Sequence, residues 1–262
     1  MKTVSVLGCG WLGMPLGEKL VQSGYNVKGS TTREDKLEDI SRRGITPFLI
    51  DLNAQNLDAS FFDSTVLILT IPPGNTSSPP QYFDQLKKVV ETAHKAGVRH
   101  TLFISSTSVY PNLNREVLED DASETALTRS GISLKKAEDL FLSQENTIIR
   151  FSGLIGPNRH PGRWFAGKGN IKGGDIPINM IHLDDCIGII ETIIENEIWG
   201  DVFNASNPEH PGKRGYYQRM AAKLGVDAPH FSETDNSAWK VVSSAKLISK
   251  TGYEFKKSVF DV

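Results

Sequence analysis

The sequence predicts an α/β fold in which a doubly wound parallel sheet is joined to a small C-terminal lobe. Short apolar segments of strand type alternate with segments of helical periodicity between residues 3 and 151. This alternation is typical of a parallel sheet, because each crossover helix returns the chain to the same edge. A second observation is a glycine-rich turn, GCGWLG at 8–13, between the first expected strand and the first expected helix. After Gly153 the pattern loosens, which indicates a smaller, mixed lobe.

Six strands are expected in the main sheet. They cover residues 3–7, 25–29, 45–50, 64–71, 100–104 and 147–151. The fourth, STVLILTI, is a continuous apolar run rich in β-branched residues, which suits a central strand covered on both faces. Helical spacing of apolar residues is found in the segments 12–20, 82–93, 134–141 and 187–194. Ser78 is expected to cap the second of these helices, with Pro79 in its first turn.

Composition places the chain among ordinary globular proteins. Of its 262 residues, 39% are hydrophobic and 23% charged, and the net charge of -2 gives no sign of a nucleic-acid surface. No window approaches the ~18 apolar residues of a membrane span, and MKTVSVLGCG does not have the pattern of a signal peptide. Cys9 and Cys186 form neither a disulfide framework nor a metal cluster. We therefore expect a cytoplasmic protein without a metal, a monomer or homodimer, whose partner is a small molecule.

The glycines at 8–13 have the spacing G-x-G-x-x-G and the context that gives this spacing meaning. Gly8 permits the tight turn, Gly10 allows close approach of a pyrophosphate, and Gly13 allows close packing of helix on strand. The N-terminus of the helix, with Trp11 and Leu12 before it, offers N–H groups to the phosphates. We therefore predict a Rossmann-type domain that binds a nicotinamide dinucleotide. Further candidates lie at the ends of the third and fourth strands, namely Asp51, Leu52, Thr70, Ile71 and Pro72.

The end of the second strand favours NADP over NAD as the cofactor. An acidic residue there holds the ribose 2′-OH of NAD, whereas an arginine accommodates the 2′-phosphate of NADP. Here the strand ends in Ser30-Thr31-Thr32-Arg33, with no acidic residue before Glu34. Arg33 can pair with a phosphate, and Ser30 or Thr31 can donate hydrogen bonds to it. The alternative is that Arg33 and Lys36 are solvated charges at the start of a helix, and NAD stays open.

Several segments together resemble the extended NAD-dependent epimerase/dehydratase branch of the short-chain dehydrogenase/reductase superfamily. They are VLGCGWLG at 6–13, IDL at 50–52, FISSTSVYP at 103–111, RFSGLIGP at 150–157 and MIHLDDC at 180–186. The resemblance implies a Rossmann domain over residues 1–154, continued by 178–205. It also implies a small substrate-binding lobe made of 155–177 and 206–262. Members of the family are oxidoreductases, epimerases and dehydratases that act mostly on nucleotide sugars.

The resemblance also implies catalytic positions, and one pair departs from the family pattern. Ser106, with Thr107 beside it, corresponds to the residue that binds the reacting oxygen, although serines 105–108 also suit a turn. The family's Tyr-x-x-x-Lys pair is missing, because Ser130 and Leu134 stand in its place. Shifted alignments bring in Lys135 or Lys136 as an ammonium near the cofactor, but both also suit a polar helix surface. Tyr110 is a further candidate proton donor, although this tyrosine usually packs in the fold.

Three more residues are candidates for substrate binding. Arg159 and Arg163 follow the sixth strand at the same edge as Ser106, where they can hold an anionic group or simply be solvated. His182 precedes two aspartates at a helix start, where it can contact ligand or bond locally. We therefore expect an atypical NAD(P)-dependent oxidoreductase, epimerase or dehydratase acting on a small anionic or nucleotide-sugar-like substrate. The alternative is a catalytically reduced NADP(H) sensor or regulatory protein.

Overall fold

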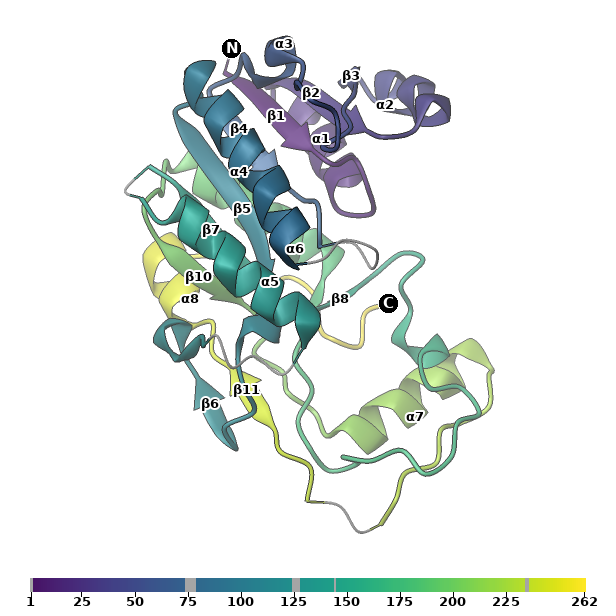
Figure 1. The fold of residues 1–262 in the computed structure, drawn as a ribbon. Helices are drawn as coiled ribbons and strands as arrows, with labels where there is room; N and C mark the ends of the chain where they lie inside the picture. The colour runs from purple at the N-terminus through teal and green to yellow at the C-terminus, as the bar shows by residue number, and fades with distance from the viewer. Residues whose placement is uncertain (1, 74–78, 124–127, 144, 234–235) are drawn as a thin grey trace.

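The main sheet has seven strands, all parallel, in the order β10-β7-β5-β4-β1-β2-β3. The computed structural model describes residues 2–73, 79–123, 128–143, 145–233 and 236–262. The strands are β1 (Thr3–Leu7), β2 (Asn26–Thr31), β3 (Thr46–Leu49), β4 (Val66–Leu69), β5 (His100–Ser106), β7 (Thr147–Phe151) and β10 (Val202–Ala205). The chain winds outward from β1 toward β3 and then from β4 toward β10, so the winding reverses between β1 and β4 (Figure 1). The predicted doubly wound α/β fold is therefore confirmed.

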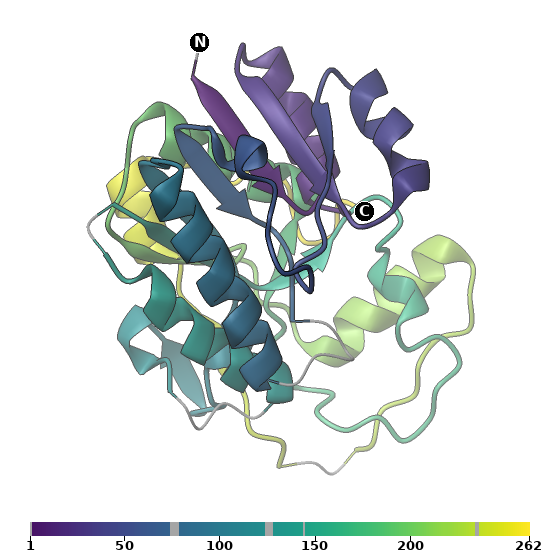
Figure 2. The same ribbon diagram turned by 45° about the horizontal axis from the view of Figure 1, so that its top comes forward.

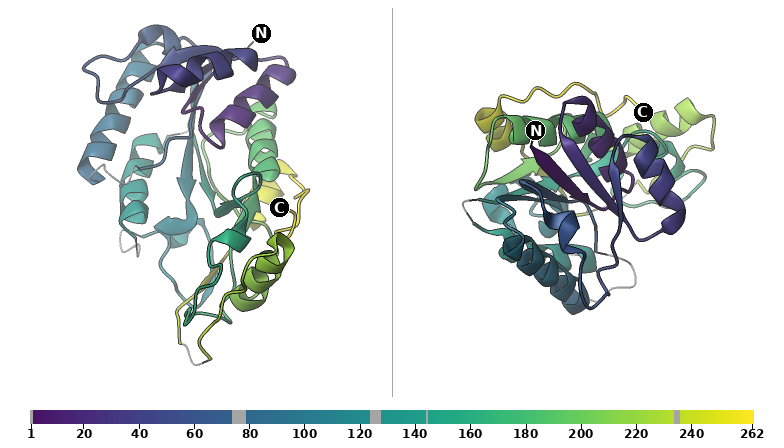
Figure 3. Two further views of the ribbon diagram at one scale, coloured as in Figure 1. Left: turned by 90° about the vertical axis from the view of Figure 1, so that its right-hand side faces the viewer. Right: turned by 90° about the horizontal axis from the view of Figure 1, so that it is seen from above.

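Helices cover both faces of this sheet (Figure 3). On one face lie α1 (Gly13–Gln22) and α6 (Leu183–Glu195), and on the other lie α4 (Pro79–Lys95) and α5 (Arg129–Glu138). The remaining helices are α2 (Leu37–Arg42), α3 (Ala59–Phe62), α7 (Lys213–Leu224) and α8 (Ala245–Thr251). The four expected helices are present, and the expected cap Ser78 lies outside the described residues.

The alternation of side chains along the strands explains the two helix layers. All four residues of β4 are buried, as expected for a strand covered on both faces. Val4 and Val6 of β1 pack in one apolar cluster with Leu16 of α1. Leu67 of β4 packs in the other cluster with Leu86 of α4. In each layer, the apolar face of a helix thus packs on the apolar side chains of one face of the sheet.

The sheet differs from the expected elements at several strand ends and by one added strand. Strand β4 covers only Val66–Leu69 of the expected 64–71. Strands β2 and β5 run further than expected, so that Thr31 and Ser106 are strand residues at the carboxyl edge. The seventh strand, β10, is not among the expected strands. Its sequence VFNA is short and contains Asn204, which is depleted in strands, so that pattern alone gives little signal.

A smaller part of the molecule lies beyond the carboxyl edge of the sheet (Figure 2). It holds two parallel strand pairs, β8 (Gly153–Ile155) with β9 (Met180–His182), and β6 (Arg115–Val117) with β11 (Lys240–Val242). Helix α7 packs against the turn at Pro161–Arg163, where a Cβ on Gly162 would lie 2.4 Å from the Met220 carbonyl oxygen. Among the described residues, no helix combines the length and the apolar character needed to cross a membrane.

Candidate cofactor and substrate groove

The glycine-rich turn after β1 has the geometry that its sequence spacing predicts. Gly8 has φ +108°, and a Cβ there would lie 2.6 Å from Ile71 Cγ2. A Cβ on Gly13 would lie 2.1 Å from the Gly8 carbonyl oxygen, so helix α1 approaches the strand as closely as backbone permits. A Cβ on Gly10, by contrast, would meet no atom within 4 Å. The turn therefore requires glycine at 8 and 13, while Gly10 borders open space of the kind that a pyrophosphate needs.

Hydrogen bonds from two neighbouring strands hold this turn in place. The Gly8 N–H donates to Ser30 Oγ at 2.9 Å, and the Cys9 N–H donates to the Ser30 carbonyl at 2.7 Å. Thr70 Oγ1 donates to the Gly8 carbonyl at 2.6 Å. Helix α1 then begins after Leu12 without a side-chain cap, which suits a helix N-terminus that receives an anion. Because Ser30 is 3% exposed, its hydroxyl fixes the turn from beneath.

A groove of about 440 Å³ runs along the carboxyl edge of the sheet at the point where the winding reverses. It is lined by Gly8, Gly10, Trp11, Leu12, Gly13, Thr70, Pro72, Pro73, Ile104, Ser105, Ser106, Ser130, Leu134, Phe151, Ser152, Leu154 and Arg159. Ligands of open α/β sheets bind at such a switch point. The fold therefore gathers most of the predicted cofactor residues, one predicted catalytic residue and one predicted substrate residue into one groove.

Ser106 borders the groove at the end of β5 and also begins a turn. Its side chain is half-buried, and its hydroxyl oxygen accepts a hydrogen bond from the Ser108 N–H at 3.1 Å. Thr107, the first residue of the following 3₁₀ turn, is 7% exposed and is not among the groove-lining residues. Ser106 can therefore form the turn and bind a substrate at once, because a hydroxyl that accepts one hydrogen bond can still donate its own hydrogen.

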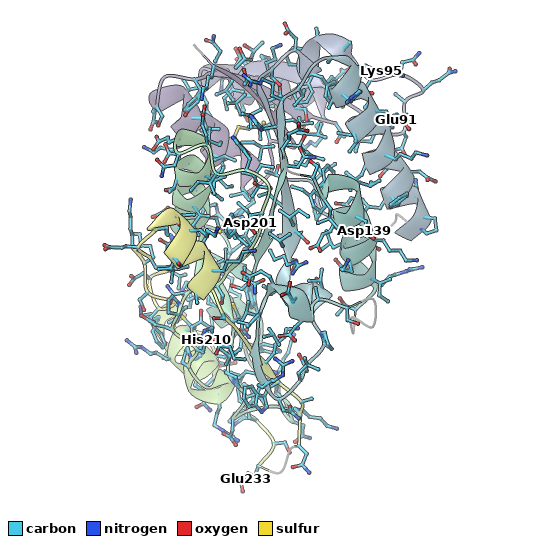
Figure 4. All side chains as sticks on the ribbon, turned by 90° about the vertical axis from the view of Figure 1, so that its left-hand side faces the viewer. Glu91, Lys95, Asp139, Asp201, His210 and Glu233 are labelled. Atoms are coloured by element: carbon cyan, nitrogen blue, oxygen red, sulfur yellow. The ribbon has the colours of Figure 1, made fainter. Side chains whose placement is uncertain are left out.

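Helix α5 presents Ser130 and Leu134 to the groove. These are the two positions that the unshifted alignment with the family pattern pairs with tyrosine and lysine. Lys135 instead donates to Asp139 Oδ1 at 3.1 Å and does not line the groove. Asp139 lies at the end of α5 (Figure 4). Lys136 is exposed. Helix α5 therefore supplies neither a phenol nor an ammonium to the groove.

Tyr110 lies in a network of buried polar side chains and not in the groove. Its hydroxyl donates to Asn204 Oδ1 at 2.5 Å and accepts from Arg150 Nη1 at 2.7 Å. Burial raises the pKa of Tyr110 to about 12. Arg150 also pairs with the carboxylate of Glu138, which in turn accepts from Ser105 Oγ at 2.6 Å. We call Ser105, Tyr110, Glu138, Arg150 and Asn204 the buried polar network.

At the end of β2, the predicted phosphate contacts have partners within the chain. Thr31 Oγ1 accepts from the Arg33 N–H at 3.1 Å, and the exposed Arg33 guanidinium pairs with Asp35, with Nε to Oδ1 at 3.0 Å. Beside the glycine turn lies a hollow of about 610 Å³, lined by Cys9, Gly10, Trp11, Met14, Glu18, Lys36, Asp39, Arg42 and Arg43. From the sequence alone Lys36 is a solvated charge at a helix start, since nothing in the pattern distinguishes it from its neighbours.

The three cations of this hollow differ in how they are neutralised. Arg42 pairs with Glu38 and Asp39, and Arg43 pairs with Glu18. Lys36, by contrast, forms no ion pair with any of the described residues. Lys36 is therefore the cation beside Gly10 whose charge is least compensated.

The other predicted cofactor residues lie next to the groove-lining set. Ile71 packs against Gly8, and the Tyr82 hydroxyl donates to its carbonyl at 3.0 Å. Asp51 is exposed and accepts from the Asn53 N–H at 2.9 Å, and Leu52 is half-buried. These residues lie at the ends of β3 and β4 but do not themselves line the groove.

The three predicted substrate residues separate in space. The Arg159 guanidinium stacks on the Trp11 ring, with Cζ 4.4 Å from the ring centroid, and lines the groove. Arg163 is exposed on the turn that packs against α7. His182 is buried at the start of α6, where Nδ1 accepts from the Asp184 N–H at 3.1 Å. Burial lowers the pKa of His182, so the imidazole is a neutral helix cap at pH 7.

The structure places both cysteines in the interior. Cys9 and Cys186 are buried free thiols, and burial raises the pKa of Cys9 to about 12. Within the described part of the chain, no group of three or more His, Cys, Asp or Glu side chains is arranged to hold a metal ion.

Comparisons with known proteins agree with this geometry. A family model described as NAD(P)H-binding matches residues 8–179. Protein YeeZ of Escherichia coli strain K12 is 33% identical over 267 residues, covering 98% of this chain and 96% of YeeZ. MoeE5 in complex with UDP-glucose and NAD has a TM-score of 0.79 at 19% identity, covering 98% of this chain and 94% of that one. A short-chain dehydrogenase/reductase superfamily protein from Agrobacterium tumefaciens with bound NAD has a TM-score of 0.77 at 17% identity, covering 98% and 93%.

Proposed function

The chain belongs to the NAD(P)H-binding family, and on that premise we propose that it is an atypical NADP(H)-dependent oxidoreductase, epimerase or dehydratase. The observation that carries the proposal is the single groove bordered by the glycine turn, Ser106 and Arg159. A dinucleotide-binding turn, a hydroxyl and a cation along one groove suit a small substrate with an anionic group, such as a nucleotide sugar. In keeping with a small-molecule enzyme, we propose a cytoplasmic protein, either monomeric or homodimeric.

The cofactor residues have distinct proposed roles. The turn from Gly8 to Gly13 and the N-terminus of α1 hold the pyrophosphate. Backbone at the ends of β3 and β4, from Asp51, Leu52, Thr70, Ile71 and Pro72, flanks the adenine and nicotinamide ends. Ser30 supports the turn from below, and Thr31, Arg33 and Lys36 surround the 2′-phosphate. A nicotinamide held by these residues would supply hydride chemistry at a carbon of the substrate.

On the substrate side, the proposal depends chiefly on Ser106. Its hydroxyl orients the reacting oxygen, with Thr107 fixing the turn that follows. Arg159 binds the anionic group, and Arg163 lies further along the lobe that residues 155–177 and 206–262 form in this proposal. His182 contacts the substrate from outside that lobe, at the start of α6. For Lys135 or Tyr110 to transfer a proton, each must first leave its present partner, Asp139 or Asn204.

The preference for NADP is tested by calorimetric titration of NADP⁺ and NAD⁺ against three proteins, the wild type, Lys36→Ala and Arg33→Ala. Lys36 borders the hollow beside Gly10, whereas Arg33 must exchange Asp35 for the phosphate. We expect Lys36→Ala to weaken NADP⁺ binding by about 1.5–3 kcal/mol, the scale of a charge-assisted hydrogen bond, and Arg33→Ala to weaken it less. NAD⁺ binding should change little in either variant. Wild-type binding of NAD⁺ as tight as that of NADP⁺ would contradict the preference.

Turnover is tested with a panel of plain ketones and UDP-sugars, followed by NADPH absorbance and product analysis. The family's tyrosine contributes as a general acid, an effect of about 10²–10⁴ in rate, so plain ketones should be turned over slowly or not at all. We expect Ser106→Ala to lower any turnover of an anionic substrate about tenfold or more, as removal of a transition-state hydrogen bond does. Ser108→Ala, two residues away and outside the groove lining, is the matched control.

A second function is favoured by one observation, the presence of Ser130 and Leu134 where the family has tyrosine and lysine. A groove without an acid and an ammonium suits a protein that senses the NADPH/NADP⁺ ratio through a partner. Two results together would favour this sensor. Wild type and Ser106→Ala would bind the dinucleotide tightly and with equal affinity, and neither would turn over any member of the panel. Rapid reduction of a plain ketone would contradict both functions.

A further inference from the structure

Trp11 connects the cofactor turn to the loop that carries Arg159. Its indole Nε1 donates to the Pro157 carbonyl at 2.7 Å, across 146 positions of sequence. Among the described residues, it is the one hydrogen bond that joins the turn 8–13 to the loop 156–163. Trp11 thus has its backbone in the pyrophosphate turn and its side chain against the substrate loop.

The loop is closed on itself where it meets Trp11. The Arg159 N–H donates to the Gly156 carbonyl at 2.9 Å, and Gly156 has φ +141°. A Cβ on Gly156 would lie 3.5 Å from Trp11 Cζ2, so the indole edge packs on this backbone. The Arg159 guanidinium covers the ring face, which is a favourable cation–π geometry. One indole therefore supports both the loop backbone and the side chain that faces the groove.

The far end of the loop is held by a different part of the molecule. The turn Pro161–Arg163 packs on α7, with Gly162 in close contact with the Met220 backbone. The loop is thus held by α7 at one end and by Trp11 at the other. Whatever steadies Trp11 steadies the position of Arg159 at the groove.

We propose that Trp11 is a positioning residue that couples dinucleotide binding to the order of the loop 156–163. The inference rests on the proposed function, since it requires a pyrophosphate at the turn. An anion bound by the turn's N–H groups favours the conformation in which Trp11 meets Pro157, and opening of the loop then becomes less favourable. Cofactor binding thereby prepares the site for the substrate anion, so that the two ligands bind with positive cooperativity.

The experiment is amide hydrogen exchange of the full chain, with and without saturating NADP⁺, while calorimetry on the same samples records NADP⁺ affinity. In the wild type we expect NADP⁺ to slow exchange of peptides within 158–163 by about three- to tenfold, the scale of one hydrogen bond. Trp11→Phe keeps an aromatic face for Arg159 but removes the donor to Pro157. This variant should bind NADP⁺ and protect residues 8–13, yet lose the slowing at 158–163. Trp164→Phe is the matched control, because Trp164 is 37% exposed on the α7 side and should keep the wild-type ratio.

The ratio of exchange rates separates coupling from a merely structural role. The proposal would be overturned if Trp11→Phe speeds exchange at 158–163 by the same factor with and without NADP⁺. The ratio of the two exchange rates would then stay at its wild-type value. Wild-type binding of NADP⁺ without any slowing at 158–163 would overturn it while leaving the proposed function intact. Failure of the wild type to bind either NADP⁺ or NAD⁺ would overturn the proposed function and this inference together.

Discussion

The groove and the buried polar network both contain polar side chains. Those of the network are bonded to one another, whereas those of the groove can still bond to a ligand. Ser105 and Ser106 are neighbours on β5, and strand alternation sends them in opposite directions. Both residues line the groove, but the Ser105 hydroxyl donates to the carboxylate of Glu138 inside the network, whereas the Ser106 hydroxyl accepts from the Ser108 N–H and can still donate to a ligand. In the network every charge has its counter-charge, as in the Arg150–Glu138 pair with side chains 5% and 1% exposed. Polar residues at one sheet edge therefore divide into those that hold the strands together and those left for a ligand.

The difference also explains why polar residues of the family pattern cannot all be assigned to chemistry. Tyr110 lies four residues from Ser106, but its hydroxyl is used by Asn204 and Arg150. A phenol that both donates and accepts inside the protein, with a pKa raised to about 12, is a poor proton donor to a groove that it does not line. We therefore regard Tyr110 as the link between β5, β7 and β10.

The largest effect that would sharpen this comparison is expected from Glu138→Gln. The substitution leaves Arg150 as an uncompensated buried charge, which should lower the free energy of unfolding by about 3–5 kcal/mol. Denaturant unfolding of the variant measures this, and calorimetry of the folded fraction should find NADP⁺ affinity unchanged. Asp139→Asn is the adjacent control, because it removes the exposed pair with Lys135 and should lower stability by about 1 kcal/mol or less. Equal losses in the two variants would break the comparison.

A smaller effect is expected from Tyr110→Phe. The substitution deletes one hydroxyl that serves both Asn204 and Arg150, so the free energy of unfolding should fall by about 1–3 kcal/mol. Any turnover measured at saturating substrate should stay at the wild-type level, because the phenol is absent from the groove lining. A normal stability together with a tenfold loss of turnover would instead identify Tyr110 as the proton donor.

The smallest effect concerns His182, whose imidazole lies beside Gly156 of the loop 156–163. Burial lowers its pKa below the ordinary value of 6.5, so the unfolded chain takes up a proton more readily than the folded one. This contribution to stability is present above pH 6.5 and is lost as the pH falls through the lower pKa of the folded state. His182→Asn keeps a helix-capping oxygen and removes the titration. Unfolding followed from about pH 8 to about pH 5 should show a shallower decline in the variant than in the wild type. An identical decline would show that other groups account for it.

The sequence by itself determined the fold class and the cofactor turn, because both depend on local pattern. Alternating strand and helix periods dictate a parallel sheet, and the spacing of Gly8, Gly10 and Gly13 dictates a tight turn with one open position. The same local information could show that Ser130 and Leu134 replace the usual pair, but not which of the shifted alignments faces the ligand.

Only the tertiary structure decided which polar side chains remain available to a ligand. Arg33, Lys135 and Tyr110 each have the right chemistry in the sequence, yet each has a partner within the folded chain. Asp35 and Asp139 lie two and four residues from their partners, whereas Asn204 lies 94 positions from Tyr110. Conversely, Lys36 and Trp11 gain their importance from neighbours, one from a hollow beside Gly10 and the other from a loop 146 positions away. The physical reason is that a hydrogen bond or ion pair is a property of two groups in space. A sequence fixes the chemistry of each group, and the fold decides whether its partner is another residue or a ligand.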